Sequence, residues 1–155
     1  MLQQIIAMRT VKQNLKAFKV NMGGVILDQA LPHKKIDSID PFLLIHHWSD
    51  TLKGGKSQKD VGVGPHPHVG FAPVSFIFEG GVHHRDSKGY EGVIEKGGTQ
   101  WMNSGNGIVH SERPMKELAE NGGKFEIIQF WVNAPAARKG DDANYQPLTY
   151  EATPK

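Results

Sequence analysis

The sequence contains two short motifs in which side chains able to bind a metal ion are separated by a single residue. The first is His-Pro-His at residues 66–68, and the second is His-Ser-Glu at residues 110–112. Side chains at positions i and i+2 of an extended strand point to the same face, so each motif aims two such groups at one point. If neighbouring strands bring these faces together inside a barrel, four groups converge. We therefore predict one metal ion with four ligands: His66, His68, His110 and Glu112.

This ligand set suits a metal ion with an open coordination position. Neutral imidazole and carboxylate groups suit iron, manganese, nickel, copper or zinc, and further positions remain for water, dioxygen or a chelating substrate. A structural zinc site is instead closed and usually contains sulfur ligands, and the chain has no cysteine. A single His-x-His pair more often belongs to a surface or a core, and His-x-Glu alone carries almost no information. Together, the two motifs favour a metal centre.

Two further histidine pairs have a different spacing. His46-His47 and His83-His84 are adjacent residues, so on a strand their side chains face opposite ways. We expect one member of each pair to enter the interior and the other to face solvent. Neither pair is assigned a ligand role.

The elements that must position these groups are short strands. Frequent Gly-containing turns separate segments rich in Val, Ile, Phe and Thr, which is typical of an all-β sandwich or barrel. One helix is expected at Pro114–Glu120, with proline at its first position and Asn121-Gly122 as its stop. The expected strands lie at residues 25–27, 74–78, 92–94, 99–102, 108–112 and 125–132, with a further short strand near 146–150.

Length and composition limit the organisation and the partners. We expect one domain over residues 1–155, with a barrel core over roughly 20–132 and a C-terminal arm over 133–155. The net charge of +2 and the absence of a dense basic stripe predict no direct nucleic-acid partner. No apolar run approaches the ~20 residues that cross a bilayer, so no membrane association is expected. The N-terminus shows no secretory signal, and the lack of cysteine fits a reducing compartment, so we expect a cytoplasmic protein.

Several blocks of the sequence, in order, resemble the pirin family of the cupin superfamily. The two most specific blocks are Pro-His-Pro-His-x-Gly-Phe at 65–71 and Gly-x-Gly-Ile-Val-His-Ser-Glu at 105–112. The resemblance implies a single cupin barrel (a double-stranded β-helix, or jelly roll) with short N- and C-terminal arms. By motif it also implies the same four ligands around a mononuclear metal, usually iron. The other blocks are Asp40 to Ile45, His84 to Ser87, Gln100 to Met102, Phe130 to Asn133 with Pro135, and Tyr145-Gln146.

The chain departs from the pirin pattern in three ways. Pirins normally carry two cupin barrels, whereas this sequence ends near the end of the first. We therefore expect a homo-oligomer or association with a second cupin half, because half of a two-barrel protein would expose an apolar patch. Ala72 stands where cupins often place a glutamate, which puts one contact around the metal in doubt. Val69 stands where pirins commonly carry arginine, which would weaken a partner surface that uses this charge.

The family resemblance implies either of two functions. Some pirins act as quercetinases, which open a flavonol with dioxygen, and this predicts a metal-dependent dioxygenase with a small aromatic substrate. Glu112 would accept the substrate's hydroxyl proton as general base. Four aromatic side chains near the mouth, for which core packing is the alternative role, would stack on the flat rings: Phe71, Phe76, Trp48 and Trp101.

The alternative is a non-catalytic protein whose metal responds to redox state and biases a partner-binding surface, as described for nuclear pirin co-regulators. A third interpretation is an isomerase-like or sugar-binding cupin, which would need polar groups inside the barrel. Redox-dependent capture of a partner without turnover would favour the second interpretation over the first.

Overall fold

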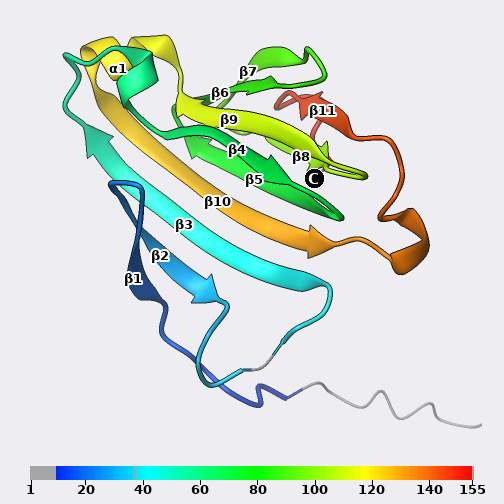
Figure 1. Ribbon diagram of the computed structural model, residues 1–155. Helices are drawn as coiled ribbons and strands as arrows, with labels where there is room; N and C mark the ends of the chain where they lie inside the picture. Colours follow the sequence, from blue (N-terminus) through cyan, green and yellow to red (C-terminus); the bar gives the residue numbers. More distant parts are fainter. Residues whose placement is uncertain (1–9, 37, 155) are drawn as a thin grey trace, which may run out of the picture.

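The computed structural model describes residues 10–36 and 38–154, which form two antiparallel β-sheets with one short helix (Figure 1). The expectation of an all-β fold is confirmed. The N-terminal residues 1–9, which the prediction about a secretory signal concerns, lie outside the described residues. No helix in the described part of the chain is long and apolar enough to cross a membrane.

The larger sheet has seven strands in the order β1-β2-β3-β10-β5-β8-β11. Its two longest strands, β3 and β10, lie side by side and run along the whole sheet (Figure 1). The strand β11 pairs with β8, so the expected C-terminal arm contributes an edge strand to this sheet. The strands are β1 (Phe18–Met22), β2 (Val25–Leu31), β3 (Phe42–Leu52), β5 (Phe71–Glu79), β8 (Thr99–Asn103), β10 (Gly123–Asn133) and β11 (Asn144–Leu148).

The smaller sheet has four strands in the order β4-β9-β6-β7. Each strand is antiparallel to its neighbours, and the two predicted motifs lie on the adjacent strands β4 and β9. Two short 3₁₀ turns, Gln58–Asp60 and Ala136–Arg138, belong to the connections. The strands are β4 (Val63–His68), β6 (Gly81–Asp86), β7 (Glu91–Glu95) and β9 (Ile108–Pro114).

The α-helix predicted after the second motif starts later than expected. α1 spans Lys116–Asn121, with Met115 as its N-cap. Pro114, expected at the first helical position, is instead the last residue of β9, where it pairs with Val82 and its carbonyl accepts a hydrogen bond from the Gln58 side chain. A proline tolerates a strand end as well as a helix start, and sheet pairing decides between the two. The helix ends at Gly122, whose φ of +77° favours glycine.

The main apolar core lies between the two sheets beside α1. Trp48 and Phe125 from the larger sheet pack edge to face with ring centroids 4.6 Å apart. Val82 and Ile94 from the smaller sheet and Leu118 from α1 belong to the same cluster. Fully burying a side chain of this size stabilises the fold by roughly 1.5–3 kcal/mol. This core holds the two sheets together and so fixes the position of the motif strands.

The two adjacent histidine pairs divide as expected. His46 and His84 are buried, and both point to the interior. Their neighbours His47 and His83 are partly exposed and hydrogen bond to the carboxylates of Glu126 and Glu91, respectively. The alternation of side chains along β3 and β6 is therefore confirmed.

Candidate metal centre

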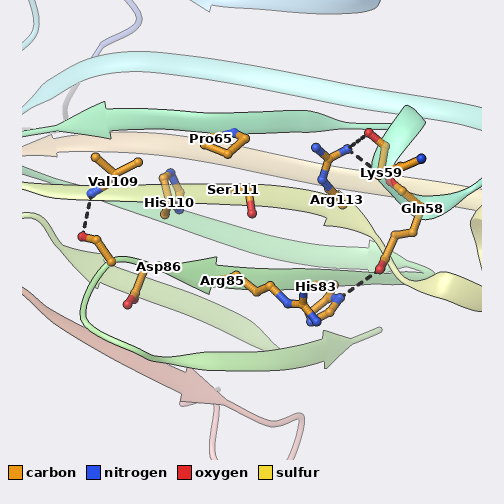
Figure 2. Close-up of a pocket in the computed structure, with 11 residues that line it drawn as sticks. Gln58, Lys59, Pro65, His83, Arg85, Asp86, Val109, His110, Ser111 and Arg113 are labelled. Atoms are coloured by element: carbon orange, nitrogen blue, oxygen red, sulfur yellow. Dashed lines mark hydrogen bonds between the residues drawn. The ribbon is translucent and has the colours of Figure 1, made fainter.

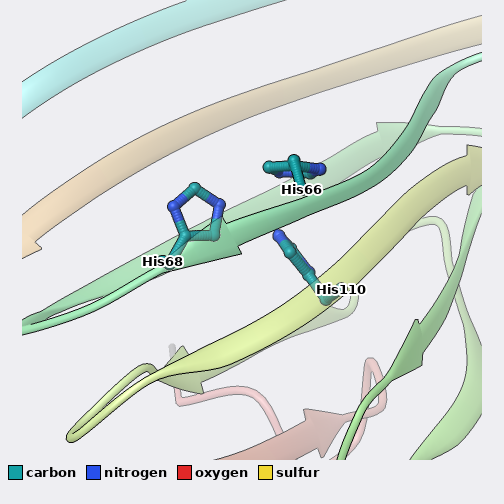
Figure 3. Close-up of side chains that lie close together, drawn as sticks. All are labelled: His66, His68 and His110. Carbon is teal, nitrogen blue, oxygen red and sulfur yellow. The ribbon is translucent and has the colours of Figure 1, made fainter.

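Three of the four predicted ligands meet between the sheets. His66 on β4 lies directly opposite His110 on β9 in the antiparallel register, and His68 follows two residues along β4. Figure 3 shows His66 and His68 rising from β4 with His110 reaching toward them from β9. The three ring centroids lie 4.5–4.9 Å apart, and one ligand atom of each residue lies within 4.8 Å of the others. This is the geometry of three imidazoles able to share one ion.

The hydrogen bonds of two rings leave the correct nitrogen free for a metal. The Nδ1 atom of His66 lies 2.8 Å from the backbone carbonyl of Gly64. A carbonyl only accepts, so Nδ1–H donates and Nε2 keeps its lone pair. The Nε2 atom of His110 is buried and has no hydrogen-bond partner among the described residues. A buried unpaired nitrogen of this kind costs about 1–3 kcal/mol, and a metal ion would satisfy it.

Burial keeps two rings of the cluster neutral, those of His68 and His110. Burial lowers the pKa of His68 to about 4, and the neighbouring His110 and His66 act in the same direction, while Glu112 opposes them. Burial, together with His66 and His84, lowers the pKa of His110 to about 3. Both rings are therefore uncharged at neutral pH, as metal ligation requires.

These low pKa values make the metal-free protein less stable in mild acid. Below about pH 6.5 the unfolded chain binds protons at His68 and His110 while the folded chain does not. The free energy of unfolding therefore falls as the pH drops toward 4, by at most about 1.4 kcal/mol per pH unit for each histidine. Urea unfolding at about pH 7 and about pH 5 measures this, and we expect a flatter pH dependence for His68→Gln. Equal urea midpoints at the two pH values for the unmodified protein would contradict it.

Glu112, the fourth predicted ligand, faces the same interior but is held by the larger sheet. Its carboxylate accepts hydrogen bonds from the side-chain amide of Gln129, at 2.8 Å, and from Gln100 and Ser75. A register shift in β4 between Val63 and His66 also breaks the regular pairing beside Glu112. Within the described ranges, the group of mutually close ligand atoms contains the three histidines and does not include Glu112.

A cavity of about 610 Å³ opens over His66 and His68, and its volume is within the range of small-molecule sites. Phe71, which we predicted here, lies with its ring centroid 5.1 Å from His68. Two lining residues from β10, Gln129 and Trp131, were not predicted. Trp131 packs 4.6 Å from Phe71 and 5.1 Å from His68. Gln129 and Trp131 are separated by one residue, which would have indicated that they share a face. Because β10 carries apolar residues on both faces, the sequence did not show which face meets the cavity.

The structure corrects the other aromatic predictions. Trp48 belongs to the apolar core and does not line the cavity over the histidines. Trp101 is 41% exposed and lines a separate hollow with Ala72. Phe76 is exposed and packs against Phe130. All of these except Trp48 lie on the outer face of the larger sheet. Because Ala72 faces away from the histidines, the glutamate expected in cupins at this position would not reach the ion from here.

A second hollow of about 460 Å³ lies on the outer face of the smaller sheet (Figure 2). It is lined mainly by residues that alternate with the motif residues, including Ser111, Arg85 and Arg113, and His110 also contributes to its lining. Arg113 donates to the backbone carbonyls of the 58–61 segment, and Arg85 forms an ion pair with Glu91. Both arginines thus already have partners in the protein, and we assign the hollow no ligand.

Comparison with known proteins decides the family. The family model described as "Pirin" matches residues 24–132. This chain belongs to the pirin family. Two curated relatives are Pirin-like protein 2 of Arabidopsis thaliana, 31% identical over 99% of this chain and 44% of its own, and a pirin-like protein of Caulobacter vibrioides, 38% identical over 85% of this chain and 45% of its own. The chain therefore spans less than half the length of these pirins.

Solved structures agree with the pirin assignment. The crystal structure of quercetin 2,3-dioxygenase from Acinetobacter baumannii is 34% identical, has a TM-score of 0.77, and is matched over 88% of this chain and 49% of its own. A bacterial pirin from Escherichia coli in complex with nickel(II), 21% identical over 84% of this chain and 53% of its own, shares the fold with a TM-score of 0.66. The predicted cupin fold and the pirin resemblance are confirmed.

Proposed function

We propose that this pirin is a metal-dependent dioxygenase that opens flavonol-type substrates, with iron as the ion and manganese, nickel, copper or zinc as the alternatives. The observation that carries the proposal is the trio of His66, His68 and His110, two of which, His66 and His68, line an aromatic-lined cavity large enough for a small ligand. The quercetin 2,3-dioxygenase of similar structure supports the choice of substrate class.

The residues of the cavity have separate tasks in this proposal. The three histidines would hold the ion, and the ion would lower the pKa of a substrate hydroxyl bound to it. Phe71 and Trp131 would pack against the flat rings of the substrate. The indole of Trp131 donates a hydrogen bond to the Gln129 side chain at 3.1 Å, which fixes the orientation of its ring.

Glu112 would take the hydroxyl proton. Its carboxylate has about four acceptor positions, and side chains of the larger sheet use only some of them. Donors on the side of the larger sheet hold the carboxylate in one orientation. The cavity lined by Glu112 is the same one that His66 and His68 line, so a substrate on the ion would lie within reach of the carboxylate.

Oxygen uptake with quercetin tests the proposal. We expect protein loaded separately with iron, manganese, nickel or copper to consume dioxygen with at least one of these ions. The corresponding flavone, which lacks the 3-hydroxyl group, should give no uptake. If the protein binds these ions but none of them supports oxygen uptake, the proposed dioxygenase activity is overturned and the metal-responsive partner-binding function is favoured.

We also propose that the outer face of the larger sheet binds a second copy of this chain. Across four neighbouring strands the register places Ile45, Phe130, Val74 and Trp101 in one apolar row. A second copy would supply the same apolar surface here.

Sedimentation velocity tests this self-association. We expect a dimer at micromolar concentration, and Trp101→Lys should shift the equilibrium toward the monomer because it places a charge in the apolar row. Val93→Lys is the matched control, since Val93 is a similarly exposed apolar residue on the smaller sheet. A protein that is wholly monomeric without substitution would contradict the proposal.

A further inference from the structure

The inner face of the smaller sheet carries a third pair with the same spacing as the two motifs. His84 and Asp86 on β6 are separated by one residue, and both side chains are fully buried. The antiparallel register between β6 and β9 places Asp86 opposite His110 and His84 opposite Glu112. Figure 2 shows Asp86 at the end of β6 near His110 on β9. This pair therefore lies next to His110, on the neighbouring strand of the same sheet.

The side chains of Asp86, His84 and His110 form a chain of hydrogen bonds. One carboxylate oxygen of Asp86 lies 2.8 Å from Nε2 of His84. The other oxygen accepts the backbone N–H groups of Lys88 and Tyr90, at 2.8 and 3.1 Å. The Nδ1 atom of His84 then lies 3.4 Å from Nδ1 of His110.

We infer that Asp86 and His84 position His110 for metal binding by fixing which of its ring nitrogens carries the proton. The carboxylate of Asp86 accepts, so Nε2 of His84 donates to it and Nδ1 of His84 is left as an acceptor. Nδ1 of His110 must then carry the proton that it donates to His84. Its other nitrogen, Nε2, keeps a lone pair, and this is the buried atom without a partner that faces His66 and His68.

The ring of His84 is itself held in place. Tyr145 stacks on it with ring centroids 3.8 Å apart and an angle of 3° between the planes. The hydroxyl of Tyr145 donates to the side chain of Gln100, which in turn contacts Glu112. The side chains that hold His110 and Glu112 are therefore in contact with each other through Tyr145 and Gln100. The partner of a ligating histidine is usually a single carboxylate or carbonyl, whereas here a second histidine stands between them.

The substitution Asp86→Asn tests the inference because it reverses the donor and acceptor roles in the hydrogen bonds that join residue 86, His84 and His110. The introduced side-chain oxygen would stay with the two backbone N–H groups of Lys88 and Tyr90, which leaves an NH₂ group facing His84. His84 would then have to accept at Nε2 and donate from Nδ1, and His110 would have to carry its proton on Nε2. That proton occupies the lone pair that the metal needs.

Two measurements on the full chain report the effect. Long-range ¹H–¹⁵N spectra of the metal-free protein show which nitrogen of His110 is protonated, and titration calorimetry with nickel(II) gives the affinity. In the unmodified protein we expect the proton on Nδ1 of His110. In Asp86→Asn we expect it on Nε2, with nickel binding weakened about 10- to 100-fold. His83→Gln, on the outer face of the same strand, is the matched control and should change neither reading.

A second variant guards against misfolding of the first. His84→Phe keeps the ring stacked on Tyr145 but removes the acceptor for His110, so the preference for Nδ1–H should be lost and nickel binding should weaken. The inference is overturned by a proton on Nε2 of His110 in the unmodified protein, or by unchanged spectra and affinity in a folded Asp86→Asn or His84→Phe variant. It rests on the metal centre of the proposed function. The spectra of the metal-free protein nevertheless decide it even where quercetin is not turned over.

Discussion

Protein carrying His66→Ala is expected to lose its bound metal almost completely. His66 supplies one of three imidazoles that meet within 4.8 Å, and its Nδ1 bond to Gly64 leaves Nε2 directed to the shared point. Removing a direct ligand should weaken metal binding more than removing a residue that only hydrogen bonds to a ligand, for which the typical loss of affinity is ~10- to 100-fold. Elemental analysis of protein purified without added metal measures the effect.

His66 is the most suitable of the three histidines for this experiment. It is only partly buried, whereas His68 and His110 are almost fully buried, so its truncation leaves the smallest cavity in the fold. His83→Ala is the control, since His83 hydrogen bonds to Gln58 and Glu91 on the outer face of the smaller sheet. Full metal content in His66→Ala, with full content in the control, would show that the ion is held elsewhere.

The second large effect is expected for Glu112→Gln, which should lower turnover of quercetin by about 10²- to 10⁴-fold as a proton acceptor is lost. Metal content should fall much less than in His66→Ala, because Glu112 lies outside the group of three close histidines. Oxygen uptake and elemental analysis on the same preparation separate the two quantities. Glu126→Gln is the matched control, since Glu126 is partly exposed and pairs with His47.

The ratio of the two losses defines the role of Glu112. If metal content falls as far as turnover, the carboxylate is a true ligand, as the spacing of the sequence motif predicts. If turnover survives, Glu112 is not the base. In either case the amides of Gln100 and Gln129 would face a side chain with one acceptor oxygen and one NH₂ group in place of a carboxylate with two acceptor oxygens. The melting temperature of the variant should therefore accompany both measurements.

The shared face of the two histidines in the first motif was predictable because it depends on local geometry. A strand has a period of two residues, so His66 and His68 share a face wherever the strand lies in the fold. The same rule separated His46 from His47 and His83 from His84. The short strands were visible for a similar reason, since Gly-rich turns and β-branched runs are local signals.

The placement of the three tryptophans was not predictable. Trp48, Trp101 and Trp131 have similar local contexts, yet one lies in the core, one on the outer face and one over the histidines. Which face of a strand meets the cavity depends on the order of strands in the sheet and on their register. Those are set by contacts between residues far apart in the chain.

The sequence by itself determined that this pirin has paired metal-binding side chains on extended strands, because side-chain alternation needs no information from the rest of the fold. Only the tertiary structure decided that His66 lies opposite His110, that Glu112 is held by amides from the larger sheet, and that Asp86 and His84 stand behind His110. Each of these contacts joins different strands, and the pairing of strands is fixed by the burial of the whole core between the two sheets.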